Sequence, residues 1–334
     1  PFAAGVMTVQ MGDRKVDVWY PADPSAVRGK KHDVYYLRSW LQSSVAALIP
    51  ADINPPFETD AFRDVPASTG SFPLVLFSHG DQGYRDQSTF LTSHLATWGF
   101  IVAAPDERER GLEFVLGGGP AHPMTDSQTL RATVNTLHAA STKRGGRLAG
   151  RVKPGKVVVT GHSGGGYAAM QFASQADVAG YVSLAAGAAL DPSRPTLTLP
   201  DKPSLFMTGS IDTVVPTAEV AGGYAAASKP SRLVTIGNAG HLMFADICLI
   251  GTSGGGVIAL AKKAGLPIPA DIEKEGTDGC QAGALPARDG FQVVDHYVTA
   301  AVRSMFGIDK RPVGLEPSVA NDFGNVKVAY RQKL

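Results

Sequence analysis

The sequence carries little charge and almost no net charge. Charged residues make up 18% of its 334 residues, and 31 Lys and Arg nearly balance 30 Asp and Glu, for a formal net charge of +1. A chain so close to neutrality gives no reason to expect nucleic acid as a partner. It also has no apolar run long enough to cross a bilayer, so we expect no integral membrane segment.

Cysteine is equally scarce, with only Cys248 and Cys280 present. Two thiols without a nearby His or Cys pair lack the ligand count of a metal site, so we expect no metal. They could be unpaired buried thiols, but two cysteines that flank a glycine-rich segment favour one disulfide. The chain also begins at Pro1 rather than Met, which we interpret as removal of an upstream segment. We therefore expect a secreted or periplasmic protein.

Motifs for common cofactors are missing as well. There is no H-E-x-x-H, residues 161–166 do not fit G-x-G-x-x-G, and residues 251–256 lack the Lys-Ser/Thr of a phosphate-binding loop. We therefore expect no cofactor. No internal repeat or low-complexity linker divides the chain, so we predict one domain over residues 1–334.

The sequence does contain a strand, a glycine-rich turn and a helix in direct succession. Residues 157–159 are all valine, as in a strand that a parallel sheet buries on both faces. The next residues fit G-x-S-x-G, with Gly161, Ser163 and Gly165 at its fixed positions. This turn is too tight for side chains two positions before and after the serine. Ser163 is therefore our candidate nucleophile, above a helix N-terminus that favours a developing oxyanion.

Strands and helices alternate along most of the chain. Residues 6–10 and 15–20 alternate apolar and polar residues around a Gly-Asp turn, which predicts a hairpin that Pro21 ends. Further strands are expected at 72–78, 100–104, 179–185, 203–208 and, as the last, 232–236, and helices at 87–98, 126–142, 217–227, 242–250, 254–264 and 289–306. This order predicts a doubly wound, mostly parallel α/β sheet with helices on both faces and an N-terminal antiparallel hairpin. Ligands of such sheets bind at the carboxyl ends of the strands.

Residues 22–72 interrupt the alternation with several prolines and charges. Within them, the apolar residues between 34 and 49 have a spacing that predicts an amphipathic helix. This insertion could act as a flap near the active site, or it could be a surface excursion that packs on the core.

A serine nucleophile needs a base to take its proton and an acid to orient that base. Asp212 follows the strand that ends at residue 208, and His241 follows the strand that ends at residue 236. Ser163, Asp212 and His241 thus occur in the order Ser, Asp, His, each beyond a different strand, as in α/β-hydrolases. We predict that they form a catalytic triad.

Other residues compete for two of these roles. Asp191, beyond the strand that ends near residue 185, is the alternative acid, although its placement after the strand is looser. Among the histidines, His162 adjoins the serine and would point elsewhere, and His296 lies in the last helix. His79 ends a strand, where we expect it to fix its own loop by hydrogen bonds.

The oxyanion of a tetrahedral intermediate needs backbone N–H donors. Gly164 follows the nucleophile and should supply one of them. The loop after the strand at 72–78 should supply the other, with Asp81 as first choice and Gln82 as runner-up, provided that the Asp81 carboxylate points away. We expect a substrate pocket lined by Gln82, Tyr84, His162 and Leu242.

Several motifs together resemble a known superfamily. They are residues 77–80 (Phe-Ser-His-Gly), 83–85 (Gly-Tyr-Arg), 99–104, 161–165, Gly240-His241 and 244–246 (Phe-Ala-Asp), with Val18-Trp-Tyr-Pro21 near the start. They look like the α/β-hydrolase superfamily, and more narrowly like its branch of platelet-activating-factor acetylhydrolases and bacterial dienelactone-hydrolase-like proteins. The resemblance covers most of residues 15–250 and implies the α/β-hydrolase fold and a serine esterase.

The chain departs from these relatives at informative positions. Dienelactone hydrolases use a cysteine nucleophile, whereas position 163 is serine, so that activity is not expected. The acetylhydrolases carry an apolar residue in place of Asp81, and cutinase-type polyester hydrolases carry Met in place of Gly164.

We therefore predict a monomeric or weakly associating serine carboxylic-ester hydrolase with an acyl-enzyme intermediate, acting on short-acyl or small esters. The alternatives are a cutinase-like polyester hydrolase, an amidase or a thioesterase with the same triad, and a hydrolase-fold protein that only binds ligands. The expected partner is a small-molecule, lipid or polymer ester.

Overall fold

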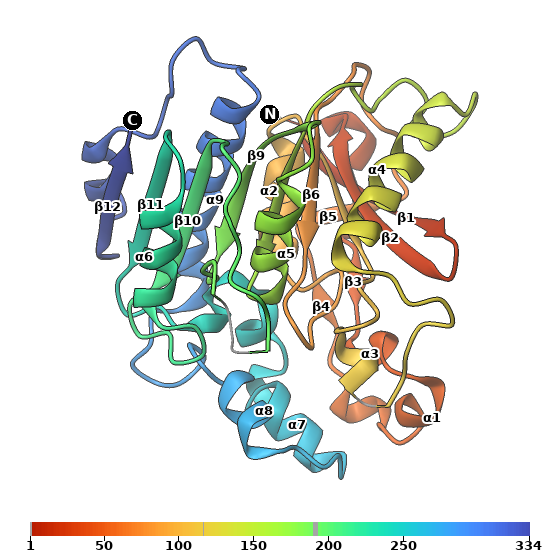
Figure 1. Ribbon diagram of the computed structural model, residues 1–334. Coiled ribbons are helices and arrows are strands. Elements are labelled where there is room, and N and C mark those ends of the chain that lie inside the picture. Colours follow the sequence, from red (N-terminus) through yellow and green to blue (C-terminus); the bar gives the residue numbers. More distant parts are fainter. Residues whose placement is uncertain (1, 116, 190–192) are drawn as a thin grey trace.

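A central sheet organises the molecule (Figure 1). The structure is a computed structural model that describes residues 2–115, 117–189 and 193–334. Its strands are β1 (Ala3–Met11), β2 (Arg14–Ala22), β5 (Ala61–Arg63), β6 (Leu74–Ser78), β7 (Ile101–Pro105), β8 (Val157–His162), β9 (Val178–Leu184), β10 (Ser204–Gly209), β11 (Ser231–Ile236) and β12 (Val328–Lys333). Within the described residues they lie in the order β12-β11-β10-β9-β8-β6-β7-β2-β1-β5, with β6 to β11 parallel.

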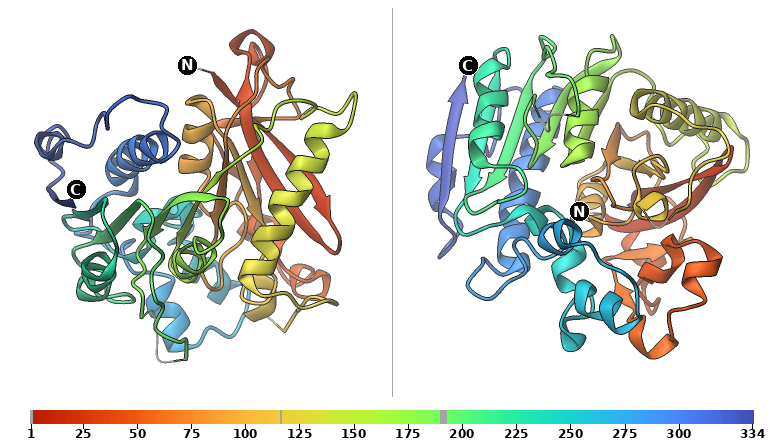
Figure 2. Two further views of the ribbon diagram at one scale, coloured as in Figure 1. Left: turned by 45° about the horizontal axis from the view of Figure 1, so that its top comes forward. Right: turned by 60° about the horizontal axis from the view of Figure 1, so that its bottom comes forward.

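Helices cover both faces of this sheet. The longer ones are α2 (Thr89–Thr97), α4 (Asp126–Thr142), α5 (Gly164–Phe172), α6 (Thr217–Ala226) and α9 (Ala287–Met305). α2 and α9 pack on one face, and α4, α5 and α6 pack on the other (Figures 1 and 2). In β8, Val158 joins the core under α2 and α9, whereas Val157 and Val159 join the core on the opposite face. Because successive strand residues face opposite sides, a strand buried on both faces needs such an unbroken apolar run.

The remaining elements are short. They are β3 (Val34–Tyr35), β4 (Phe57–Glu58), α1 (Ser43–Ala46), α3 (Leu112–Val115), α7 (Val257–Lys263), α8 (Ala270–Glu275) and the 3-10 helices η1 (Pro24–Val27), η2 (Leu37–Trp40), η3 (Ala51–Ile53), η4 (His241–Phe244), η5 (Asp246–Leu249), η6 (Thr252–Gly254) and η7 (Pro317–Asn321). The right-hand view of Figure 2 shows α7 and α8 next to the insertion at 22–72.

The predicted α/β-hydrolase fold and its N-terminal hairpin are confirmed. β1 and β2 pair antiparallel from Ala3–Ala22 to Met11–Arg14, around a turn in which Gly12 has a φ of 59°. Pro21 does not end β2, however, because its carbonyl accepts from the N–H of Ser68 on the side away from β1. The nitrogen and carbonyl of a strand residue face the same side, so the missing N–H of Pro21 leaves the β1 ladder intact.

The helix predicted within residues 34–49 is wrong. That stretch contains the short strand β3 and two short helices, η2 and α1, neither longer than about one turn. Tyr35 pairs with Phe57 between β3 and β4, and its ring lies 5.1 Å from that of Phe57 and 5.8 Å from that of Tyr84. Aromatic packing against the body of the molecule overrides the helical spacing.

Two further elements differ from the sequence-based expectations. The strand at 232–236 is not the last, because β12 pairs antiparallel with β11 at the sheet edge, and Val328 and Tyr330 pack on the core. The helix expected at 242–250 is instead the pair of 3-10 turns η4 and η5, and α8 was not expected at all.

The expected disulfide joins Cys248 to Cys280. Such a bond is compatible with the secreted or periplasmic location that we predict. Of the helices in the described residues, none is both long and apolar enough to cross a membrane.

Candidate active site

Ser163 occupies a strained turn between β8 and α5. Its φ is 54° and its ψ is −123°, a combination that non-glycine residues rarely adopt. A Cβ on Gly161 would lie 2.1 Å from the carbonyl oxygen of Gly165, and a Cβ on Gly165 would lie 2.0 Å from that of Ser78. Both glycines of the motif are therefore required by close backbone approach, as the sequence predicts.

His241 and Asp212 form a hydrogen-bonded pair at the same sheet edge. Nδ1 of His241, at the start of η4, donates to Oδ2 of Asp212 over 2.9 Å. The other carboxylate oxygen, Oδ1, accepts from the backbone N–H groups of Val214 and Val215 at 2.9 and 2.8 Å. These bonds orient the carboxylate and leave Nε2 of the imidazole for proton transfer.

Ser163 and His241 line one cavity, although the Ser163 hydroxyl makes no hydrogen bond to His241 within the described residues. Such bonds are often long or absent when no substrate is bound. The alternative acid, Asp191, lies outside the described residues.

His162 and Gln87 connect three loops beneath this cavity. The N–H of Gly80 donates to Oε1 of Gln87 over 3.0 Å, and Nε2 of Gln87 donates to Nδ1 of His162 over 3.0 Å. Nε2 of His162 donates in turn to the carbonyl of His241 over 3.0 Å. Burial lowers the pKa of His162 well below its usual value, so the ring stays neutral. His162 thus holds the elbow, the loop after β6 and the base loop together.

His79 also fixes its loop, as we expected. Nδ1 donates to the carbonyl of Gly80 over 2.8 Å, and Nε2 accepts from the N–H of Glu107 over 3.1 Å. Burial and the nearby Arg110 lower the pKa of His79 to about 3. The remaining candidate, His296 of α9, donates to the carbonyl of Gly314 and lies far along the chain from the triad.

The backbone N–H groups around Ser163 differ in whether they are already engaged. The N–H of Gln82, the runner-up donor, donates to the carbonyl of Arg110 over 2.6 Å, and the N–H of Gly80 donates to the side chain of Gln87. The N–H groups of Asp81 and Gly164 have no hydrogen-bond partner among the described residues. These two donors therefore remain free for an oxyanion.

The side chain of Asp81 does not point away from the elbow, contrary to our expectation. A Cβ on Gly164 would lie 2.2 Å from its Oδ1. The carboxylate is bound by Arg194, with Nη2 at 2.8 and 2.6 Å from its two oxygens, and Nη1 of Arg110 lies 3.7 Å away. These guanidinium groups offset the negative charge beside the elbow.

The cavity has a volume of about 280 Å³. All four residues predicted for the pocket line it, namely Gln82, Tyr84, His162 and Leu242. Sequence analysis missed most of its apolar wall: Leu37 from η2, Leu112 from α3, Val214, Val215, Ile247, Val257, Ile258 and Ile272. It also missed Glu275 of α8, whose Oε2 accepts from Nε2 of Gln82 over 3.1 Å.

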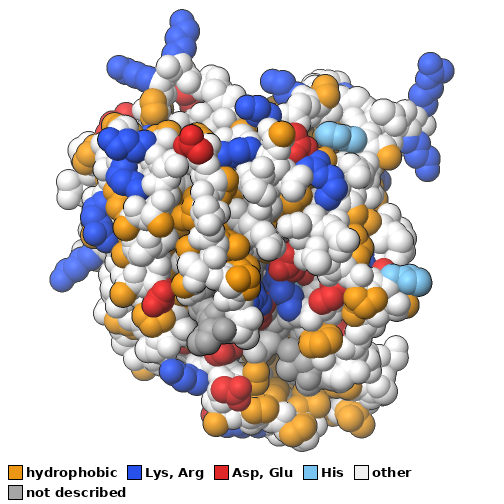
Figure 3. Space-filling view, in the orientation of Figure 1, with side chains coloured by type: hydrophobic (Ala, Val, Ile, Leu, Met, Phe, Trp, Pro, Cys, Tyr) orange, Lys and Arg blue, Asp and Glu red, His pale blue; other side chains and the backbone are white. Residues whose placement is uncertain are grey.

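One signal for the missed wall was present in the sequence. Cys248 closely follows His241, so its disulfide with Cys280 brings the intervening segment next to the base loop. Hydrophobic side chains also appear on the surface where α7 and α8 lie (Figure 3).

Within the described residues, no group of three or more His, Cys, Asp or Glu is arranged to hold a metal ion.

A doubly wound sheet with a serine elbow at its carboxyl edge defines an α/β-hydrolase of the esterase and lipase type. Comparisons with known proteins agree with this class. The family model described as chlorophyllase matches residues 52–224, just over half of the chain. The chain therefore belongs to the chlorophyllase family.

Two individual proteins are also similar. A protein of Schizosaccharomyces pombe, provisionally named a phospholipase A2, is 26% identical over 122 residues, which span 33% of this chain and only 27% of that protein. The solved structure of a ferulic acid esterase from Streptomyces cinnamoneus covers 99% of this chain and 96% of its own, with a TM-score of 0.64 and 23% identity. At that identity the second likeness supports the fold alone.

Proposed function

We propose that this chain is a serine carboxylic-ester hydrolase that works through an acyl-enzyme intermediate. The observation that carries the proposal is the His241–Asp212 pair, which opens onto the cavity that Ser163 lines on a strained backbone. Strain of this kind collects at functional sites, where surrounding structure maintains it. The residue order and the two free N–H groups support the same chemistry.

In the proposed reaction the Ser163 hydroxyl attacks the ester carbonyl while Nε2 of His241 takes its proton. Asp212 stabilises the resulting imidazolium through Nδ1, and the N–H groups of Gly164 and Asp81 donate to the oxyanion. His241 then passes the proton to the leaving alcohol. Water attacks the acyl-enzyme with His241 again as base, which releases the carboxylic acid and restores Ser163.

The cavity supports small or short-acyl esters as substrates. Its volume of about 280 Å³ lies at the lower end of ligand pockets, and its wall is mainly aliphatic. Leu37 brings one residue of the insertion at 22–72 to this wall, so we infer that the insertion shapes substrate entry. The names of the family and of the two similar proteins point to ester hydrolases with different substrates, so they support the reaction rather than one substrate.

The proposal is tested at Ser163. An organophosphonate should label this serine in the folded protein, as peptide mass spectrometry would show, and Ser163→Ala should lower turnover of an activated ester by roughly 10⁴-fold or more. Ser210→Ala is the matched control, because Ser210 is exposed and accepts only the N–H of Asn238. Unchanged hydrolysis in Ser163→Ala would contradict the proposal.

Two comparisons separate the alternative functions. A matched ester, thioester and anilide would distinguish an esterase from a thioesterase or an amidase. A series of p-nitrophenyl esters tests the substrate size, and an optimum beyond about ten acyl carbons would contradict the small cavity as the acyl site. Absence of turnover on every activated ester would favour a protein that only binds ligands.

A further inference from the structure

Residues 249–279 form a segment that the Cys248–Cys280 disulfide closes, and we call it the disulfide-closed cap. It carries α7 and α8 and supplies Val257, Ile258, Ile272 and Glu275 to the cavity wall. Between residues 251 and 277, all of which the structure describes, no residue is fully buried. The cap therefore has no core of its own, and its position depends on its attachments to the rest of the molecule.

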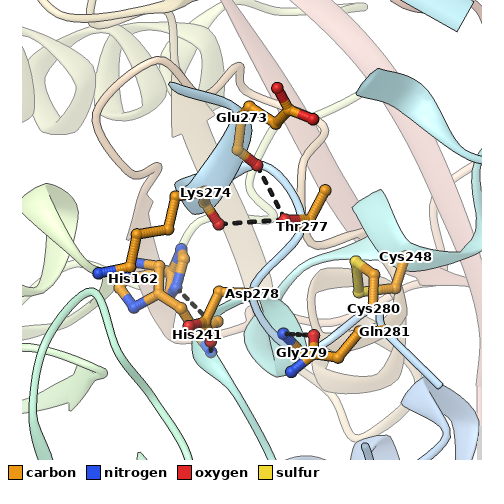
Figure 4. Close-up of a disulfide and its surroundings, with 10 residues drawn as sticks. All are labelled: His162, His241, Cys248, Glu273, Lys274, Thr277, Asp278, Gly279, Cys280 and Gln281. Atoms are coloured by element: carbon orange, nitrogen blue, oxygen red, sulfur yellow. Dashed lines mark hydrogen bonds between the residues drawn. A yellow bond between two sulfur atoms is a disulfide. The ribbon is translucent and has the colours of Figure 1, made fainter. Parts of the chain in front are cut away.

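One of these attachments is the side chain of Asp278, which is only 6% exposed. Its Oδ1 accepts the backbone N–H of His241 over 2.6 Å. Its Oδ2 accepts the N–H of Thr213 over 3.0 Å and the hydroxyl of the same residue. Its backbone carbonyl accepts the N–H of Leu242 over 2.9 Å. Figure 4 shows Asp278 beside His241, with the disulfide close by on the same stretch of chain.

Asp278 thus joins the loop of the proposed base to the loop of the proposed acid. Thr213 directly follows Asp212, so one carboxylate holds the backbone on both sides of the His241–Asp212 bond. The backbones also approach closely here, since a Cβ on Gly240 would lie 2.5 Å from the Cα of Gly279. A small shift of this loop would therefore move the imidazole relative to Ser163.

We propose that Asp278 is a positioning residue for His241 and that the Cys248–Cys280 disulfide keeps Asp278 in place. This inference rests on the proposed esterase function. Cys280 lies two residues after Asp278, and Cys248 lies in η5, just after the turn that His241 begins. The disulfide consequently anchors both ends of the cap to the base loop.

The first test is Asp278→Asn. Asparagine has one accepting oxygen, so either His241 or Thr213 loses its acceptor. Turnover of a small p-nitrophenyl ester should fall roughly 10- to 100-fold, with KM changed by less than about twofold, because the proton-transfer geometry is disturbed and the pocket is not. Asp33→Asn is the matched control, since Asp33 is a buried carboxylate paired with Arg63 and does not line the cavity. It should lower the melting temperature and leave kcat unchanged.

The second test breaks the disulfide. A dithiol reductant supplies two electrons and two protons, so the two sulfurs become thiols while the reagent forms its own disulfide. Cys280 is exposed and accessible to the reagent. Reduction should lower kcat of the wild type to the level of the double variant Cys248→Ala/Cys280→Ala, and the reductant should not affect that variant.

The outcomes separate this inference from the proposed function. If the wild type hydrolyses no ester, the proposed function fails. If the wild type is active and folded Asp278→Asn retains its kcat, the positioning role is overturned. Should Asp278→Asn fail to fold, as judged by circular dichroism, the reduced wild type decides instead: a lower kcat at unchanged KM supports the inference, and an unchanged kcat overturns it.

Discussion

The two sides of the cavity are held in place by different means. The sheet side carries Ser163, Asp212 and His241, each beyond a parallel strand whose side chains are buried on both faces. The opposite side consists of the disulfide-closed cap and part of the insertion at 22–72, which meet in a small cluster around Tyr35, Tyr84 and Ile250. The first side is fixed by the main core, whereas the second depends on a disulfide and a few side-chain bonds.

The two sides of the cavity therefore have different roles. Residues proposed for bond making lie on elements that cannot shift without disturbing the core. Residues that shape the pocket lie on short elements with little buried surface, where substitutions cost little stability. We expect substitutions on the sheet side to abolish activity and substitutions of the pocket-lining residues on the cap side to change substrate preference.

The largest effect is expected at Gly165 on the sheet side. A Cβ there would lie 2.0 Å from the carbonyl oxygen of Ser78, and backbone cannot yield as a flexible side chain can. Gly165→Ala should therefore lose most activity and several degrees of melting temperature. The control is Gly222→Ala within α6, where an added Cβ would meet nothing within 4 Å. An active and stable Gly165→Ala variant would contradict the inference that the core holds the sheet side of the cavity rigidly in place.

A smaller, selective effect is expected at Glu275 on the cap side. Its carboxylate lines the cavity and should disfavour esters that carry a negative charge. Glu275→Gln should raise kcat/KM for a carboxylate-bearing ester roughly tenfold relative to its neutral analogue, while activity on the neutral ester stays similar.

The same prediction has a pH dependence. Burial raises the pKa of Glu275. As the pH falls, its carboxylate is therefore protonated, and loses its charge, at a higher pH than an ordinary glutamate. The wild type should therefore discriminate against anionic esters more strongly at pH 9 than at pH 5. Glu273→Gln, on the same helix and paired with Lys262, is the control. An equal change in both variants would show that Glu275 has no special part in selectivity.

The smallest effect on activity, but a measurable one on stability, is expected at Asp246 in η5. Its carboxylate accepts the N–H and hydroxyl of Thr89 at the start of α2, and burial raises its pKa from 3.8 to about 7. The unfolded chain loses this proton near pH 4 and the folded chain near pH 7, so the contribution to stability falls as pH rises between them. The loss is at most about 1.4 kcal/mol per pH unit.

Asp246→Asn removes this titration. The melting temperature of the variant minus that of the wild type should therefore increase between pH 4 and pH 7 and stay constant above pH 8. Other titrating groups cancel in this difference. A difference that is flat throughout would mean that the Asp246 carboxyl does not titrate in this range.

The sequence allowed most of the sheet side to be predicted. The valine run of β8, the glycines around Ser163 and the positions of Asp212 and His241 all follow from local rules on strands, turns and residue order. Those rules work because parallel strands demand unbroken apolar runs, and because a tight elbow tolerates only glycine at fixed positions. The strand β12 was missed, because an edge strand buried on one face gives a weaker signal than a central one.

The cap side could not be predicted in the same way. Within residues 34–49 helical spacing was present, but aromatic packing of Tyr35 decided the conformation. Asp278 carries no sequence motif, and its contact with His241 spans 37 positions. Gln87 is likewise recognisable only from its bonds to Gly80 and His162.

The sequence by itself thus determined the α/β class, the serine elbow, the order of the three proposed catalytic residues and the one pair of cysteines. Only the tertiary structure decided which backbone N–H groups remain free, which way the Asp81 carboxylate points and which segment covers Ser163. The physical reason is that the two kinds of interaction act over different separations along the chain. Strand burial and turn geometry are set by neighbours in the chain, whereas hydrogen-bond competition and pocket walls depend on residues that meet only after folding.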